Sequence, residues 1–234
     1  MTGRIALILA AVLTFIHGAR GGEKQFHVVL KGNLTTGSQL FPNPESTDEV
    51  KRSSRVFLDN SLGYGLELRY IMPEINLAVG AGAEYIKTTT SFTNFVSGNR
   101  SYQVEDGYQV IPVEVTGYFI IPLSGPFFGI YMGGGGGMYL GRRLYSIGGV
   151  AAGSVDLGHG FGIHVLGGIS LALTETFSVI AEMKFRDLQF ESSNAFPVST
   201  IRSNGNVITV PTSPFPSRVH TDGIVFQLGT ALRW

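Results

Sequence analysis

Residues 62–70 read LGYGLELRY, and this stretch decides the fold because its side chains alternate in character with a period of two. That period is typical of a β-strand, whose successive side chains point to opposite faces of the sheet. One face is wholly apolar, and the other collects glycines and charges. The apolar positions are Leu62, Tyr64, Leu66, Leu68 and Tyr70, and the opposite positions are Gly63, Gly65, Glu67 and Arg69.

The same alternation recurs in seven further segments of the chain. An apolar face opposite a charged one is typical of a membrane barrel, whose outside meets lipid and whose inside is polar. A soluble ligand-binding barrel has the reverse arrangement. The sequence therefore predicts an all-β fold, an eight-stranded antiparallel up-and-down transmembrane β-barrel. The other segments are residues 25–33, 75–85, 111–121, 127–140, 160–171, 177–186 and 224–234.

The composition agrees with a membrane barrel. Hydrophobic residues make up 44% of the 234 residues and charged residues only 15%. No apolar run beyond the first twenty residues has the length of a spanning helix, and a chain that faces lipid without such a helix must close its strands into a barrel. Composition alone leaves a glycine-rich soluble β-protein open, and the polarity of the strand faces decides against it.

The charge balance argues against nucleic acid as a partner. Lys and Arg together number 17 and are matched by 17 Asp and Glu residues, so the chain has no basic field that would hold a phosphate backbone. The absence of cysteine removes disulfides, thiolate metal sites and a lipidated cysteine anchor. We expect no cofactor and no metal site.

Residues 1–21 predict a signal peptide for export. Arg4 precedes the apolar run 5–16, and small residues flank Arg20 as they do at a cleavage site. As a helix, that run would rise only about 18 Å, which is too short to span a bilayer. Residues 22–234 are then the outer-membrane barrel domain. The alternative is an uncleaved N-terminal anchor.

The predicted connections alternate strictly between short and long. Short periplasmic turns and longer extracellular loops produce this alternation in outer-membrane barrels. Both ends of the barrel domain would then lie on the periplasmic side, with four loops outside the cell. Tight turns are expected at 73–74, 122–125 and 174–176, and long polar loops at 36–54, 90–106, 144–156 and 192–220.

The last loop contains a predicted hairpin. Residues 199–202 and 207–210 favour strands, and Asn204-Gly205 between them is the preferred centre of a type I′ turn. The prolines at 211, 214 and 216 would end its ladder. Its apolar side would serve an extracellular protein or glycan partner, or alternatively would shield the barrel mouth. The residues concerned are Phe196, Val207, Ile208, Val210 and Phe215.

The inward faces gather charges that should pair. An eight-stranded barrel is only wide enough to be filled by its own side chains, and an isolated buried charge costs far more free energy than a paired one. We therefore predict an internal ion-pair plug, with a polar conduit or proton path as the alternative. The predicted charge cluster comprises Lys31, Glu67, Arg69, Glu84, Glu114, Glu182, Lys184, Arg186 and Arg233, with His27 and His164 on the same faces.

Two features that suggest catalysis do not support an enzyme. A serine hydrolase needs its serine within hydrogen-bonding reach of its histidine, but Ser170 and His164 lie six residues apart on one strand, about 20 Å. The run Gly133–Gly137 lacks the Gly-Lys-Ser/Thr and the helix of a phosphate-binding loop. In a strand, such glycines make room for large inward side chains such as Tyr118.

Residues 107–115, GYQVIPVEV, and the final strand 226–234 resemble the small outer-membrane β-barrel domain proteins of the OmpA/OmpX/OmpW type. The resemblance covers essentially the whole chain after residue 21. It implies contact with outer-membrane lipids and a C-terminal strand that belongs to the signal read by the barrel-assembly machinery. The residues of this assembly signal are Phe226, Leu228, Leu232 and Trp234.

Fold alone does not determine function, so several roles stay open. The expected role is the non-enzymatic display of extracellular loops by a monomeric barrel, for structural or surface-interaction purposes. One alternative is a narrow conduit for small or apolar solutes, as the resemblance to OmpW-like barrels would allow. A lipid-modifying barrel enzyme is a third.

Overall fold

The computed structural model describes residues 25–96, 100–122, 127–221 and 223–234. The predicted signal peptide at 1–21 and most of the turn expected at 122–125 lie outside these residues. In this part of the chain, helix is limited to α2 (Glu49–Ser53) and the 3-10 turn η1 (Pro73–Ile75). No helix of the described residues is long and apolar enough to cross a membrane.

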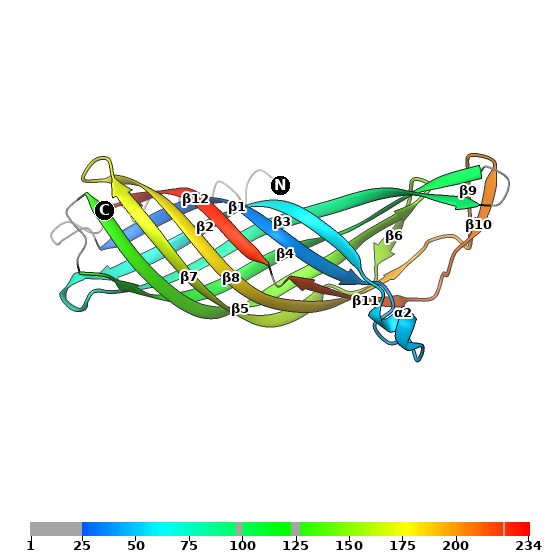
Figure 1. Ribbon diagram of the computed structural model, residues 1–234, viewed down its shortest axis with the longest axis horizontal. Helices are drawn as coiled ribbons and strands as arrows, with labels where there is room; N and C mark the ends of the chain where they lie inside the picture. Colours follow the sequence, from blue (N-terminus) through cyan, green and yellow to red (C-terminus); the bar gives the residue numbers. More distant parts are fainter. Residues whose placement is uncertain (1–24, 97–99, 123–126, 222) are drawn as a thin grey trace, which may run out of the picture.

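Eight long antiparallel strands form a closed ring, as the alternation predicted (Figure 1). Each strand pairs with its neighbours in the ring, and β1 pairs with both β2 and β12, which closes the sheet. Closure satisfies the backbone groups that hydrocarbon would leave unpaired. The strands are β1 (Phe26–Phe41), β2 (Val56–Met72), β3 (Leu77–Val96), β4 (Arg100–Ile120), β5 (Phe128–Ile147), β7 (Gly158–Ala172), β8 (Phe177–Ala195) and β12 (Ile224–Arg233).

A second, shorter strand continues the last strand of the ring toward the extracellular end. β11 (Phe215–Thr221) pairs with β8 and with the end of β1, and β12 pairs with the same two strands further down. Pro216 lies inside β11, opposite Ser193. As the second residue of a strand, Pro216 removes one donor without interrupting the pairing that follows.

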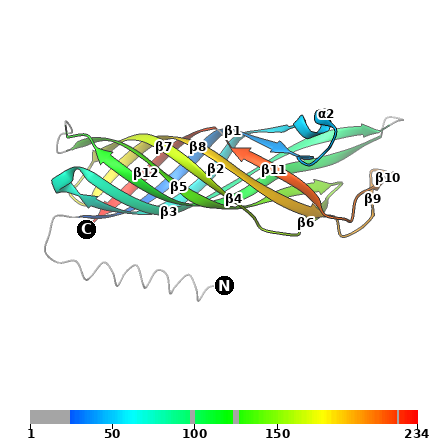
Figure 2. The same ribbon diagram turned by 90° about the horizontal axis from the view of Figure 1, so that it is seen from below.

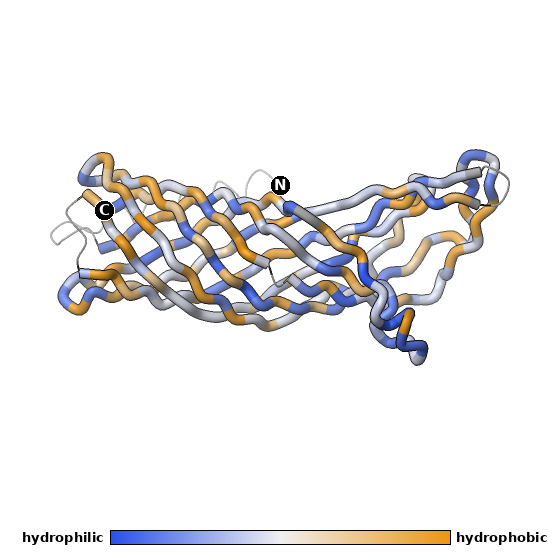
Figure 3. Tube along the Cα trace, in the orientation of Figure 1, coloured by the Kyte–Doolittle hydropathy of each residue, from blue (hydrophilic) through white to orange (hydrophobic). Residues whose placement is uncertain are grey.

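The two faces of the sheet carry the side chains that the alternation predicted. Leu66 and Leu68 are about half exposed, whereas Glu67 and Arg69, which alternate with them, are buried. Figure 3 shows the resulting change of hydropathy along the strands. The outward apolar side chains form what we call the apolar belt, which includes Leu30, Leu66, Val79, Val113, Val115, Ile130, Ile163, Val165, Ile169, Met183, Phe185 and Leu228.

The strands continue far beyond the apolar belt, into regions where the sequence analysis expected loops. β3 runs to Val96 and β4 begins at Arg100 (Figure 2), so the loop expected at 90–106 is mostly an antiparallel ladder and that prediction is wrong. Outside the membrane both faces of a strand meet water, so polarity no longer distinguishes a loop from a strand, and β-branched threonines favour the extended chain. The loops expected at 36–54, 144–156 and 192–220 are likewise shortened by β1, β5, β8 and β11, and by the short strand β6 (Val150–Ser154).

The opposite end of the barrel carries the short turns. Asn76 ends η1 in the left-handed region, with φ of 54°, a conformation that asparagine tolerates well. In the turn at 174–176, the hydroxyl of Thr174 accepts a hydrogen bond from the backbone N–H of Phe177 at 3.0 Å. Backbone hydrogen bonds between Phe26 and Trp234 bring the start of β1 and the end of β12 together at this end. Topology thus assigns it to the periplasm.

The glycines of β5 and β7 make room for inward tyrosines, as predicted for Tyr118. A Cβ atom added at Gly133 would lie 3.0 Å from Cδ1 of Tyr118, and one at Gly168 would lie 2.6 Å from the ring of Tyr131. The two tyrosine rings meet edge to face, with centroids 5.9 Å apart. Glycine is therefore needed where a large side chain from the next strand crosses the lumen.

Replacing Leu66 by Arg should lower the free energy of unfolding by about 2–4 kcal/mol, because the guanidinium would face hydrocarbon. Urea titration of the barrel in lipid vesicles measures this change. Thr93→Arg is the matched control, since Thr93 is exposed on the part of β3 beyond the apolar belt, and it should leave stability unchanged. Equal stability of the two variants would show that the outward face does not meet lipid.

Candidate functional site

Charged side chains cross the lumen in two layers, and the layer nearer the short turns is the lower cluster of Lys31, Glu67, Arg69 and Glu182. Lys31 forms ion pairs with both carboxylates, and its Nζ lies 2.7 Å from Oε2 of Glu182. Arg69 also contacts both, at 3.0 Å to Glu67 and 2.9 Å to Glu182. Each carboxylate therefore meets two cations and each cation meets two carboxylates. The four residues come from β1, β2 and β8.

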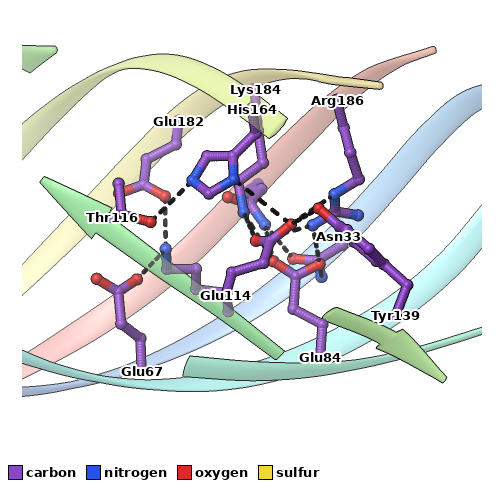
Figure 4. Close-up of polar contacts among 12 residues, drawn as sticks. Asn33, Glu67, Glu84, Glu114, Thr116, Tyr139, His164, Glu182, Lys184 and Arg186 are labelled. Atoms are coloured by element: carbon purple, nitrogen blue, oxygen red, sulfur yellow. Dashed lines mark hydrogen bonds and ion pairs between the residues drawn. The ribbon is translucent and has the colours of Figure 1, made fainter. Parts of the chain in front are cut away.

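The second layer, the upper cluster, repeats this arrangement with Glu84, Glu114, Lys184 and Arg186 (Figure 4). Lys184 lies 2.9 Å from Glu84 and 2.8 Å from Glu114. Arg186 lies 2.7 Å from Glu84 and 2.9 Å from Glu114. All four side chains are buried. The predicted ion-paired interior is thus present in the structure, with four acids and four bases that cancel in charge.

Arg233 is the one member of the predicted charge cluster that the structure places apart from these two layers. Lys31 pairs across the sheet with Gly229, so Arg233 lies four residues further along β12, about 13 Å toward the periplasmic mouth. Its inclusion in the cluster was wrong because the shared inward face says nothing about height along the barrel.

Three tyrosines complete the hydrogen bonding of the carboxylates, and the sequence analysis gave none of them this role. Tyr118 donates to Glu67 at 2.6 Å, Tyr131 to Glu182 at 2.7 Å and Tyr139 to Glu114 at 2.7 Å. The guanidinium carbon of Arg69 also lies 3.9 Å from the ring centroid of Tyr118, a cation–π distance. Tyr131 and Tyr139 belong to the glycine-rich strand, where the alternation was too blurred to assign inward positions.

Two amides extend the upper cluster to the strand pair that closes the barrel. Asn33 donates to Glu84 at 2.9 Å, and Gln227 donates to both Glu84 and Asn33 at 3.0 Å. Asn33 and Gln227 are also paired residues of β1 and β12. The strand pair β1–β12, which closes the barrel, is therefore hydrogen-bonded to the upper cluster, since buried polar groups must find partners within the protein.

His164 lies between a hydroxyl and a carboxylate, in the order of a hydrolase triad. Its Nε2 is 2.8 Å from Oγ1 of Thr116, and its Nδ1 is 3.7 Å from Oε1 of Glu114. The second distance exceeds hydrogen-bonding range, and Thr116 and His164 are both buried. The adjoining cavity, lined by Thr116 and Glu114, has a volume of about 20 Å³, room for roughly one water molecule. This group is therefore built for packing, and a substrate has no room beside it.

Apolar side chains close the lumen above the upper cluster. The ring of Tyr108 meets that of Phe190 with centroids 6.2 Å apart. Further toward the extracellular end, Arg143 binds Asp106 through two hydrogen bonds of 2.8 and 2.6 Å. Sequence analysis missed this apolar layer because Leu40 and Val219 fall in the expected loops, and it missed the ion pair because Asp106 does too. The layer comprises Leu40, Leu58, Ile86, Tyr108, Val110, Tyr139, Leu188, Phe190 and Val219.

The predicted hairpin in the last loop is confirmed as β9 (Thr200–Ser203) and β10 (Asn206–Thr209). Asn204 and Gly205 have φ of 49° and 74°, the two positive values that a type I′ turn requires. The N–H groups of the Asn204 and Asn206 amides donate to the backbone oxygen of Ser101. These bonds attach the hairpin to the extended part of β4.

The apolar side of this hairpin packs against the barrel, so the prediction that it is available to a partner is wrong. Phe196, Ile201 and Val210 are buried in one cluster with Val104 of β4, and Phe215 packs against it. Val207 alone of the five predicted apolar residues is largely exposed, at 68%. Burial also raises the pKa of Tyr145 beside this cluster, so its phenol is neutral near pH 7. The hairpin shields the extracellular mouth.

Replacing Glu114 by Gln should lower the free energy of unfolding by about 3–5 kcal/mol, because Lys184 and Arg186 would lose half of their countercharge in a buried site. Urea titration in vesicles measures the loss. Glu105→Gln is the matched control, since Glu105 is an exposed carboxylate on the same strand, and it should change stability little. If both variants unfold alike, the upper cluster does not stabilise the barrel.

Known proteins resemble this chain in structure, although none of the sequence comparisons finds a match. No protein family model and no curated protein matches the sequence. The outer-membrane protein OprG of Pseudomonas aeruginosa is similar in structure, with a TM-score of 0.53 and 12% identity over 92% of this chain and 98% of OprG. Neisserial surface protein A is also similar, with a TM-score of 0.48 and 12% identity over 89% of this chain and 97% of that one.

Among the described residues, no group of three or more His, Asp and Glu side chains has the arrangement of a metal site, and the lumen carboxylates already form ion pairs with lysine and arginine side chains.

The outward apolar belt, the closed ring and the fold shared with OprG together indicate the kind of protein. The protein is a small, eight-stranded, integral β-barrel of the bacterial outer membrane.

Proposed function

We propose that this protein is a monomeric, non-enzymatic barrel that presents a rigid extracellular extension to an extended segment of a protein partner. The observation that carries the proposal is the uncharged, unpaired edge of β3 above the membrane. Two further features support it: the lumen is filled by ion pairs and apolar layers, and the buried Thr116–His164 pair has no space for a substrate. The closed ring also provides no unpaired strand in the apolar belt through which two copies could join.

The extension is long and well ordered by pairing. β3 is paired with β2 as far as Lys87 and then continues with β4 alone, over Thr88–Val96. Nine residues of strand reach about 30 Å. Lys87, exposed beside Gln109, lies at the base of this projection, next to Arg142, which donates to Gln109 at 3.0 Å. The apolar belt gives way to polar side chains at this level, so the ladder above it stands in water.

The edge of this ladder has the chemistry of a strand-docking site. Residues 88–96 read TTTSFTNFV and contain no charge, proline or glycine, whereas natural edge strands are usually protected by lysine, proline or a bulge. No described residue pairs with the side of β3 that faces away from β4 beyond Lys87. Phe95 is 79% exposed on this strand. A partner strand would gain backbone hydrogen bonds along this edge and apolar contact with Phe92 and Phe95.

Two lysines on the edge should abolish the interaction. Cells that display the wild-type barrel should bind at least one member of a panel of immobilised secreted and cell-surface proteins, and cells that display Ser91→Lys/Thr93→Lys should lose at least nine-tenths of that binding. Thr47→Lys/Val50→Lys is the control, because Thr47 is exposed just before α2 and Val50 is exposed within it, and it should bind as the wild type does. Binding to glycans alone, or equal binding by both double variants, would contradict the proposal.

The alternative role, a narrow conduit for small or apolar solutes, predicts a steady current that the proposed function does not. Two charged layers and an apolar layer cross the lumen, so the wild-type barrel in planar bilayers should pass no sustained single-channel current. A variant with both Tyr131→Ala and Tyr139→Ala lacks two large inward rings. It shows the ion current that a lumen with less side-chain packing lets through, against which the wild type is compared. Sustained conductance of the wild type would reject the closed barrel in favour of the conduit.

Assembly by the barrel-assembly machinery is part of the same proposal. Phe226, Leu228 and Leu232 lie at alternate positions on the outer face of β12, each about half exposed or more. Trp234 follows them and stacks on Phe26 with ring centroids 6.3 Å apart. An aromatic and apolar row on one face of the final strand is what the assembly signal requires according to the family resemblance.

A further inference from the structure

A cavity of about 490 Å³ opens at the periplasmic mouth of the lumen, below the lower cluster. It lies at the end of the barrel where Figure 1 marks the C-terminus. Every strand of the ring contributes to its wall, among them β1 through His27, β8 through Ile180 and β12 through Arg233. Its volume is within the range of about 300–1,000 Å³ that ligand sites usually have. The proposed extracellular function makes no use of it.

The wall of this cavity is mostly apolar although the lumen above it is charged. Ile71, Ala78, Ile120, Ile180 and Ala231 all line it. These side chains occupy inward positions of their strands, where the two clusters further up the barrel carry charges. An apolar wall at a mouth that opens to water favours a guest with an apolar body.

Arg233 brings a positive charge to the wall of this apolar cavity. Its Nε is buried, and no described atom accepts a hydrogen bond from it. Arg69 forms the inner boundary, but Glu67 and Glu182 already compensate its charge. Glu175 is the one carboxylate among the described lining residues, and it lies exposed on the turn at the rim. One negative charge inside the cavity would complete the hydrogen bonding of Arg233.

We propose that this cavity binds a single-chain amphiphile with one negatively charged headgroup, which pairs with Arg233 while the alkyl chain lies against the apolar wall. At about 30 Å³ for each group the size of a water molecule, 490 Å³ holds roughly sixteen such groups. A carboxylate on a chain of medium length fits this space. The site is independent of the edge of β3, so either proposal can fail without the other.

Binding of octanoate labelled with ¹³C at its carboxyl group tests the site. The protein is placed in detergent-free lipid nanodiscs, and NMR titration is corrected with empty nanodiscs for partition into lipid. Octanol and octylammonium are the matched probes without a charge and with the opposite charge, and acetate tests the headgroup alone. Octanoate should bind saturably, and the other three probes should bind about tenfold more weakly or less.

Two variants separate the charge from the cavity. Arg233→Gln should weaken octanoate binding about tenfold, whereas Arg142→Gln, which removes an exposed arginine at the other end of the barrel, should have no effect. Ala172→Phe keeps every charge but fills the cavity that Ala172 lines, and it should abolish binding. Equal binding of octanol and octanoate, or wild-type binding by either Arg233→Gln or folded Ala172→Phe, would overturn the proposal.

Discussion

A charge inside this barrel must be compensated by other side chains of the lumen, because its middle is filled by side chains and the wall faces lipid. This constraint organises the structure from the middle outward. Lys31 and Glu182 are 151 residues apart in sequence, and Arg186 and Glu84 are 102 apart, yet each pair is in hydrogen-bonding contact. Such pairs form only when the ring has closed with the correct register. A shift of one residue would point these charges at hydrocarbon.

The charged layers also explain where the glycines and tyrosines lie. A carboxylate shared between two cations still has lone pairs to satisfy, and the phenols of Tyr118, Tyr131 and Tyr139 reach across the lumen to supply donors. A ring that crosses the lumen needs space on the neighbouring strand, which Gly133 and Gly168 provide. Ion pairs, tyrosines and glycines are thus successive consequences of one requirement, that buried charges find partners within the lumen.

The sequence predicted the fold well because lipid enforces a strict two-residue alternation. Leu66 and Glu67 could be assigned to opposite faces without any knowledge of their neighbours, and eight of the nine charges predicted for the interior form the two clusters. Arg233 was misplaced because alternation gives the face of a residue but not its height. Beyond the apolar belt, lipid no longer enforces the alternation of apolar and polar side chains. The sequence analysis therefore predicted a loop at 90–106, where β3 and β4 form a ladder. Asn204-Gly205 was predictable there because a type I′ turn is a local requirement.

The two ends of the molecule differ in how their lumen is filled and in whether its charges are compensated. Above the charged layers, the apolar layer around Tyr108 and Phe190 and the hairpin packed on Val104 close the lumen to the outside. Below them the wall becomes apolar but the mouth stays open, and Arg233 lies there without the partner that every charge of the two clusters has. The Nε of Arg233 is buried without an acceptor, and this costs free energy that the fold does not recover by itself. A feature of this kind is most economically explained by a guest that supplies the missing acceptor, whereas the extracellular end presents the edge of β3 to a partner.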